Sequence, residues 1–220
     1  MKSFFIITYI NYFKRKSILD KFAAKDDFFF VQIGANDGIS NDPIRKYILK
    51  YKWRGILVEP IPETFELLKQ NYSDQEQLIF ERLVISDTKG KVDFYKSPRS
   101  VLSSLHDDSW FKENNSFGYL NRKIAGGAEK IQVDSMPLME LLHKHNVGHL
   151  DLLQIDTEGF DAEIIEMLDF TEIKPVLIAY EDHHYAQDVR DRLRALLQSH
   201  GYSLLNVGPD KLAYLADRVK

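Results

Sequence analysis

The stretch "VQIGANDGISND", Val31–Asp42, begins as an apolar run and ends as a polar segment rich in turn residues. Its first residues continue the preceding "FFF", and together they have the length and composition of a buried strand. Gly34 and Gly38 predict a sharp turn, because glycine adopts backbone conformations that other residues avoid. A helix is expected to follow at "NDPIRKYILKYKW", with Pro43 in its first turn. The stretch therefore predicts a strand–turn–helix unit.

Outward from this unit, strands and helices alternate along the chain. "GILVEP" and "LIFERLVIS" predict two more strands, with the helix "IPETFELLKQNY" between them. "LDLLQID" and "KPVLIAYED" predict later strands, each followed by a helical pattern. Such alternation is typical of an α/β fold with a mostly parallel sheet and helices on both faces. "YSLLNVGPDKLAYLA" closes the chain as an antiparallel hairpin.

The sequence predicts one main domain with two additions. Residues 1–25 are expected to form an N-terminal helical extension, and residues 26–220 a single domain with an insertion at 97–128. The insertion scatters aromatic residues among Ser, Asn, Gly and Asp, which fits either a segment folded over the substrate or a surface excursion. The apolar start "MKSFFIITYINYFKRKS" is too short to span a bilayer and lacks a cleavage site. It fits a helix that packs on the domain, joins a homodimer or rests on a membrane surface.

Composition excludes several classes of function. The chain has 220 residues, a formal net charge of -4 and no cysteine. It therefore has no disulfide, no thiolate nucleophile and no cysteine-bound zinc, which agrees with a cytoplasmic location. Charges of both signs are interspersed, so nothing in the overall charge favours a nucleic-acid partner.

The glycine turn and the second strand predict a nucleoside ligand. In an open parallel sheet, ligands bind beyond the carboxyl ends of the strands. Glu59 ends the apolar strand "GILVEP", where a dinucleotide fold places the acid that binds ribose, although it also fits a solvated strand end. A pyrophosphate site would favour glycine at Asn36, and Asp37 would repel the phosphates. S-adenosylmethionine has no phosphate and carries a sulfonium, an ammonium and a carboxylate, so it fits this turn better.

Four stretches in register resemble a known family. "FFFVQIGANDGISND", "WRGILVEPIPETFELLKQNY", "VISDTKGKVDFY" and "LDLLQIDTEGFDAEIIEML" are similar to the FkbM-type methyltransferases. The resemblance implies a Rossmann-like, seven-strand class I methyltransferase fold and S-adenosylmethionine as the cofactor. Most members of the family methylate hydroxyls of saccharides or polyketide-type natural products. The resemblance therefore implies an O-methyltransferase whose acceptor is a small-molecule or glycan hydroxyl.

The resemblance also implies which residues bind the cofactor. The turn after the first strand would hold the methionine end, Glu59 the ribose, and the segments after the second and third strands the adenine. The implied residues are Gly34, Ala35, Asn36, Asp37, Gly38, Glu59, Pro60, Ile61, Ser86, Asp87 and Asp156. One position departs from the pattern, because an acid is common where this chain has Gln32. Asp37 or Asp156 would then hold the ammonium group instead.

Methyl transfer to an alcohol requires alignment of the hydroxyl and removal of its proton. The candidate bases are His183 first and His184 second, in "EDHH", with Asp156 as a further catalytic residue, because histidine titrates near neutral pH. The same loop also fits a solvated strand end. A hard divalent metal held by Asp156, Glu181 and Asp182 is a less favoured alternative.

The acceptor is expected to contact the insertion and the later strand ends. The predicted substrate residues are Ser103, Ser104, Trp110, Glu158 and Glu181. Other functions fit the same fold: a non-catalytic Rossmann-like binding module, N-methylation, or methylation of nucleic acid. A nicotinamide-dependent enzyme is disfavoured by Asn36 and Asp37.

Overall fold

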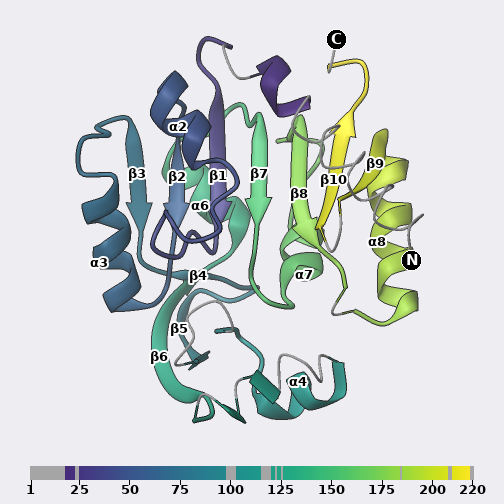
Figure 1. Ribbon diagram of the computed structural model, residues 1–220. Helices are drawn as coiled ribbons and strands as arrows, with labels where there is room; N and C mark the ends of the chain where they lie inside the picture. The colour runs from purple at the N-terminus through teal and green to yellow at the C-terminus, as the bar shows by residue number, and fades with distance from the viewer. Residues whose placement is uncertain are drawn as a thin grey trace, which may run out of the picture.

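The computed structural model describes residues 18–22, 25–97, 103–114, 120–121, 123–124, 126–183, 185–207 and 210–218. Its main sheet has seven strands in the order β3-β2-β1-β7-β8-β10-β9 (Figure 1). The strands are β1 (Phe29–Ile33), β2 (Arg54–Val58), β3 (Leu78–Glu81), β7 (Leu152–Ile155), β8 (Leu177–Glu181), β9 (Tyr202–Val207) and β10 (Asp210–Leu215). All neighbours pair in parallel except β10, which is antiparallel to both β8 and β9. The predicted Rossmann-like fold with a C-terminal antiparallel hairpin is confirmed.

Helices cover both faces of this sheet. One face packs against α2 (Arg45–Tyr51) and α3 (Pro62–Asn71), together with the short helix at 18–22. The other face packs against α6 (Leu138–Lys144), α7 (Asp161–Glu166) and α8 (Gln187–Ser199). The central strands are thus buried on both sides, which explains their unbroken apolar sequences.

A smaller sheet lies beyond the carboxyl ends of the parallel strands (Figure 1). It contains β4 (Val84–Ile85), β5 (Gly90–Lys96) and β6 (Glu129–Met136) in the order β4-β6-β5, and α4 (Asp108–Asn114) lies beside it. The prediction of one strand over "LIFERLVIS" was wrong, because β3 ends at Glu81 and Val84 already pairs with Ser135 of β6. The chain therefore changes sheets at 82–83 and builds a cap over the main sheet.

Several predictions fall on residues outside the described ranges. These are most of the N-terminal helix (1–17), His184, and the parts 98–102, 115–119, 122 and 125 of the insertion. At 18–22, Leu19 is buried against α2 and β1, and Asp20 accepts a hydrogen bond from the Tyr47 hydroxyl at 2.8 Å. Within the described ranges, no helix has the length and apolar character that a membrane span requires.

Candidate active site

A cavity of about 430 Å³ opens at the carboxyl ends of β1, β2, β7 and β8, on the side of the main sheet where the cap lies. Its walls come from the turn after β1, the ends of the parallel strands, the segment 83–85 and residues of the insertion. The predicted site residues that line it are Gly34, Ala35, Asn36, Glu59, Pro60, Ile61, Ser103, Asp156, Glu158 and Glu181. Residues that are far apart in the sequence thus form one wall.

The turn after β1 depends on two glycines. Gly34 and Gly38 have φ values of +79° and +71°, which favour glycine. A Cβ on Gly34 would lie 1.9 Å from the backbone oxygen of Asp156, and a Cβ on Gly38 would lie 2.5 Å from the Tyr72 ring. The Gly34 amide also donates to the Val58 carbonyl at 3.0 Å. Glycine is required at Gly34 because the ends of β1, β2 and β7 pack closely there, which leaves no room for a side chain.

Glu59 connects the turns after β1 and β2. Its carboxylate is only 5% exposed and accepts hydrogen bonds from the backbone amides of Asn36 and Ile61, each at 3.0 Å. Burial raises the pKa of Glu59 to about 7, the two amides oppose that rise, and the charges of Asp156 and Asp37 add to it. The carboxyl therefore titrates near neutral pH inside the cavity wall.

Gln32 presents an unsatisfied acceptor to the same cavity. It lies on β1, is 4% exposed, and its Oε1 has no hydrogen-bond partner among the described residues. A buried amide oxygen without a partner costs free energy, so its presence in a cavity wall points to a ligand that donates a hydrogen bond. The residue that departs from the family pattern is thus part of the binding wall.

Two turn residues predicted to bind the cofactor lie outside the described lining. Asp37 accepts hydrogen bonds from the amides of Ile39 and Ser40 at 2.8 and 2.7 Å. Burial acts to raise the pKa of Asp37, but these hydrogen bonds outweigh it and lower the pKa overall. Gly38 packs on Tyr72. Both residues therefore stabilise the conformation of the turn and are not among the described residues that line the cavity.

The segment after β4 differs from the expected adenine edge. The buried Ser86 hydroxyl donates to the carbonyl of Thr88 at 2.9 Å, and Asp87 is exposed. Neither is among the described lining residues, whereas the apolar Leu83 and Ile85 are. The apolar residues of "ERLVIS" indicate that this segment is buried, but assigning it to one long strand placed it in the main sheet instead of the cavity wall.

The cap is held on the loop that follows β7. The Ser104 hydroxyl donates to the Glu158 carbonyl at 3.2 Å, and the His106 Nε2 lies 2.9 Å from the Gly159 carbonyl. The Trp110 ring stacks on His106, with centroids 4.0 Å apart and an interplanar angle of 6°. Ser104 and Trp110 therefore fasten the cap instead of lining the cavity. His106 was missed because nothing near it in the sequence marks the contact.

Replacing Gly159 by alanine is expected to loosen this cap. The new Cβ would meet the Trp110 ring at 2.3 Å, and φ at Gly159 is +109°. Hydrogen exchange over residues 103–111 should become at least about tenfold faster, because local opening becomes easier. The control is Gly127→Ala, which also has a positive φ (+83°) but no atom closer than 3.9 Å. Equal protection in both variants would contradict this role for the Trp110 contact.

The charged side chains at the end of β8 and in the loop after it have three different surroundings. His183 is 45% exposed, is not among the described lining residues, and its Nδ1 lies 3.3 Å from Glu181 Oε2. Asp182 forms an ion pair with Lys211 at 2.8 Å. Glu181 lines the cavity. Within the described part of the chain, no three acidic or histidine side chains are grouped to hold a metal ion.

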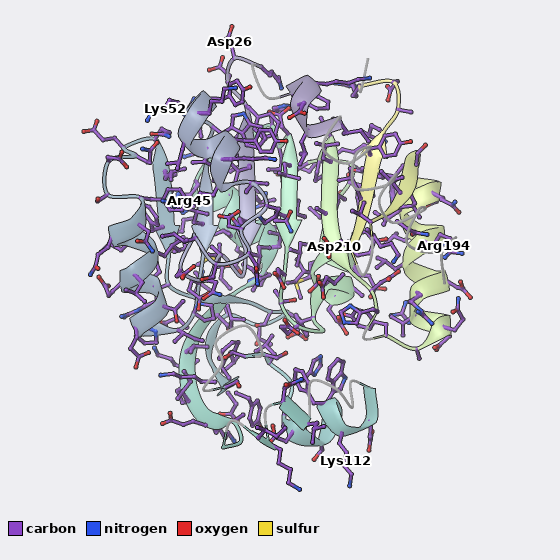
Figure 2. The ribbon with its side chains drawn as sticks, viewed as in Figure 1. Asp26, Arg45, Lys52, Lys112, Arg194 and Asp210 are labelled. Atoms are coloured by element: carbon purple, nitrogen blue, oxygen red, sulfur yellow. The ribbon has the colours of Figure 1, made fainter. Side chains whose placement is uncertain are left out.

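Asp210 lies beside Glu181 in the wall of the cavity. It is the first residue of β10, labelled in Figure 2. It pairs with Glu181, the last residue of β8. Burial raises the pKa of Glu181 to about 8, and the negative charges of Asp210 and Asp161, together with the hydrogen bond to Asp210, add to that rise. Asp210 was missed because only the sheet order brings it to this strand end. Other lining residues missed from the sequence include Asp42, Leu83, Phe94, Leu105, Gln154, Phe160 and Tyr180.

The sequence also matches a family model. The model of the methyltransferase FkbM domain matches residues 32–204. The chain belongs to the FkbM methyltransferase family. Its reaction is therefore methyl transfer, and its cofactor is S-adenosylmethionine. The matched range includes the cavity-lining strand ends and turns up to Glu181.

Three solved structures have similar folds at low identity. Precorrin-6y C5,15-methyltransferase from Geobacter metallireducens is 13% identical, with 91% of this chain and 86% of that one covered and a TM-score of 0.45. Fibrillarin from Methanococcus jannaschii is 12% identical, with 88% and 68% covered and a TM-score of 0.44. Aeropyrum pernix fibrillarin bound to S-adenosyl-L-methionine is 12% identical, with 91% and 74% covered and a TM-score of 0.43. No curated protein matches the sequence significantly.

The cavity of this FkbM-family methyltransferase fits S-adenosylmethionine chemically. The Glu59 carboxylate would accept hydrogen bonds from the ribose hydroxyls. The apolar side chains of Ile61 and Leu83 would flank the adenine. The unpartnered Gln32 Oε1 would accept a hydrogen bond from the ammonium group, as a neutral replacement for an acid. The residues present thus supply an acceptor or an apolar surface for each part of the cofactor.

Proposed function

We propose that this FkbM-family methyltransferase is an O-methyltransferase that acts on a hydroxyl of a saccharide or a natural product. The observation that carries the proposal is the group of carboxylates at the ends of β7 and β8. Asp156, Glu158 and Glu181 line the cavity there. Carboxylates accept hydrogen bonds from hydroxyl groups and can take the proton that an alcohol loses as it reacts. The wall therefore suits an acceptor with several hydroxyls.

The residues have two tasks in this proposal. Bound S-adenosylmethionine supplies a methyl group on a positively charged sulfur. The chain must align the acceptor hydroxyl, an effect worth about 7–11 kcal/mol. Asp156, which follows β7 and is open to the cavity, takes the proton from the hydroxyl oxygen. His183 is the alternative base, connected to the cavity through its contact with Glu181.

A nucleic-acid acceptor is less well supported than a small polar one. Binding to nucleic acid depends on Lys and Arg contacts to phosphates. The described residues that line the cavity include neither, and the whole chain has a net charge of -4. A small-molecule or glycan hydroxyl requires no such contacts.

The reaction can be tested with a panel of saccharides and hydroxylated natural products. With methyl-labelled S-adenosylmethionine, mass spectrometry and NMR should locate the transferred methyl on oxygen. Asp156→Asn is expected to lower turnover at saturating cofactor about 100-fold, as loss of a general base does. His183→Ala tests the alternative base. Label on nitrogen or carbon would contradict O-methylation, and full turnover in Asp156→Asn would remove Asp156 from proton transfer.

A further inference from the structure

The charged side chains of the cavity wall have one sign. Its carboxyl-bearing residues are Asp42, Glu59, Asp156, Glu158, Glu181 and Asp210. Among the described lining residues there is no lysine, arginine or histidine. The cations near the cavity have other partners or directions. Arg45 donates to the carbonyls of Gly38 and Asn71, and the Lys112 side chain extends away from the main sheet (Figure 2). Lys211 forms an ion pair with Asp182 at 2.8 Å, and its charge partly offsets the negative charge around Glu181. A ligand in this cavity therefore meets a negative wall.

The acids concentrate on the side where the acceptor would bind. Glu59 belongs to the proposed ribose end, whereas Glu181 and Asp210 lie across the sheet at the ends of β8 and β10. The carboxyls of Glu181 and Asp210 are joined by a hydrogen bond. Glu158 adopts the left-handed conformation, at φ +54°, and lines the same cavity. A non-glycine residue rarely adopts this conformation, so the loop holds Glu158 in a disfavoured geometry.

A second observation, independent of the carboxyls, indicates that the cavity binds a ligand. The buried Gln32 Oε1 lines it without a hydrogen-bond partner among the residues that the structure describes. A buried acceptor costs free energy when no donor reaches it, so a ligand that donates a hydrogen bond here would relieve that cost. The cavity wall therefore favours ligands that donate hydrogen bonds, and its carboxyl-bearing residues line the same cavity as Gln32.

We propose that Glu181 and Asp210 bind a protonated amino group of the acceptor, so that the acceptor is an amino-bearing polyol such as an amino sugar. This inference rests on the proposed function and specifies its substrate class. The amino group is the recognised group, and a hydroxyl remains the methylated one. S-adenosylmethionine contributes one net positive charge, which leaves most of the wall negative. A phosphorylated or carboxylated acceptor would be repelled, and an ammonium group would be attracted.

Proton exchange should accompany such binding. Burial and the neighbouring negative charges raise the pKa of Glu181 to about 8, so this carboxyl carries a proton near neutral pH. An ammonium group placed beside it favours the ionised form, so that proton leaves to solvent. The charged or titratable groups that act on Glu181 come from β10, α7 and the loop after β8, and they are Asp210, Lys211, Asp161 and His183. A neutral sugar would not displace this proton.

Binding of matched probes tests the proposal without any reaction. The whole 220-residue chain, saturated with S-adenosylhomocysteine, is titrated with D-glucosamine, D-glucose, N-acetyl-D-glucosamine and D-glucose 6-phosphate. D-glucamine and sorbitol form an open-chain pair. Each amine should bind at least about tenfold more tightly than its neutral counterpart, as expected for hydrogen bonds to charged groups. Calorimetry in two buffers of different ionisation enthalpy should show proton release for the amines alone.

Variants assign the effect to the carboxyl pair. In Asp210→Asn and Glu181→Gln, the preference for amines should fall to less than about threefold and proton release should stop. Glu66→Gln, an exposed carboxyl on α3, should keep both. Unchanged S-adenosylhomocysteine affinity shows that a variant is folded, and the wild-type panel decides the matter if neither variant folds.

Two results would overturn the proposal. One is equal binding, or no binding, of amine and neutral probes to the wild-type protein. The other is an amine preference that survives in folded Asp210→Asn and Glu181→Gln. Failure of the proposed function is separate, because methyl transfer that never reaches oxygen would leave the binding result intact.

Discussion

Replacing Glu59 by alanine is expected to weaken S-adenosylmethionine binding about 100-fold, with each hydrogen bond to a charged group contributing about 1.5–3 kcal/mol. The variant removes the carboxylate proposed to bind the ribose. It also frees the amides of Asn36 and Ile61, which Glu59 holds at 3.0 Å. Isothermal titration of the cofactor measures the loss. Unchanged affinity would discard the ribose assignment.

The pH dependence of cofactor binding separates the charge of Glu59 from its shape. The pKa of Glu59 is about 7, well above the ordinary 4.5, and ribose hydroxyls donate to the ionised form. Cofactor affinity should therefore rise about tenfold from pH 6 to pH 8 in the wild type. Glu59→Gln, which keeps the size of the side chain, should remove this rise. The pKa of Glu59 rises from its ordinary value of 4.5 to about 7 in the folded protein. This difference stabilises the folded state fully below pH 4.5, and the contribution is lost as the pH rises through 7. The free energy of unfolding of Glu59→Gln should therefore increase relative to that of the wild type between pH 4.5 and pH 7.

The fold could be predicted because its signals are local and repeated. The apolar run ending in Ile33 and the strand ending in Val58 both lie in the middle of the sheet, buried on both faces. The break between β3 and β4 could not be predicted, because the apolar pattern continues across Arg82 and only pairing with β6 moves Val84 to another sheet. Local pattern identifies a strand, but it does not identify the partner of that strand.

The candidate site shows the same division. Glu59 could be found because it is a single acid after an apolar strand, at a spacing that the fold dictates. Asp210 could not, because its position opposite Glu181 depends on β10 lying between β8 and β9. His106 likewise meets Gly159 only after the cap folds over the strand ends. Residues that reach the site only through contacts between distant parts of the chain cannot be identified from their spacing in the sequence.

Asp37 and Gly38 show a different limit. Both were expected to bind the cofactor, yet the Asp37 carboxylate accepts hydrogen bonds from the amides of Ile39 and Ser40, and Gly38 packs on Tyr72. A polar residue in a glycine turn satisfies backbone amides as readily as it binds a ligand. The sequence identifies the turn, but the hydrogen bonds decide which of its members face the cavity.

Replacing Gly34 by alanine is expected to destabilise the fold by about 3 kcal/mol or more, because overpacking against backbone leaves little room for adjustment. The new Cβ would lie 1.9 Å from the Asp156 carbonyl oxygen, which belongs to backbone and cannot rotate away. Relief requires the ends of β1 and β7 to separate, although the Asp156 amide donates to the Ile33 carbonyl at 3.0 Å. Urea denaturation measures the loss in free energy of unfolding.

Gly201→Ala is the matched control for this substitution. Gly201 has φ +83°, close to the +79° of Gly34, but no neighbouring atom lies nearer than 4.0 Å to the position that its Cβ would take. Its alanine variant carries the backbone strain alone, about 1–2 kcal/mol. The difference between the two variants therefore reports the contact between the strand ends. Equal destabilisation would show that Gly34 is required for its dihedral angle, and that the approach of Asp156 adjusts at little cost.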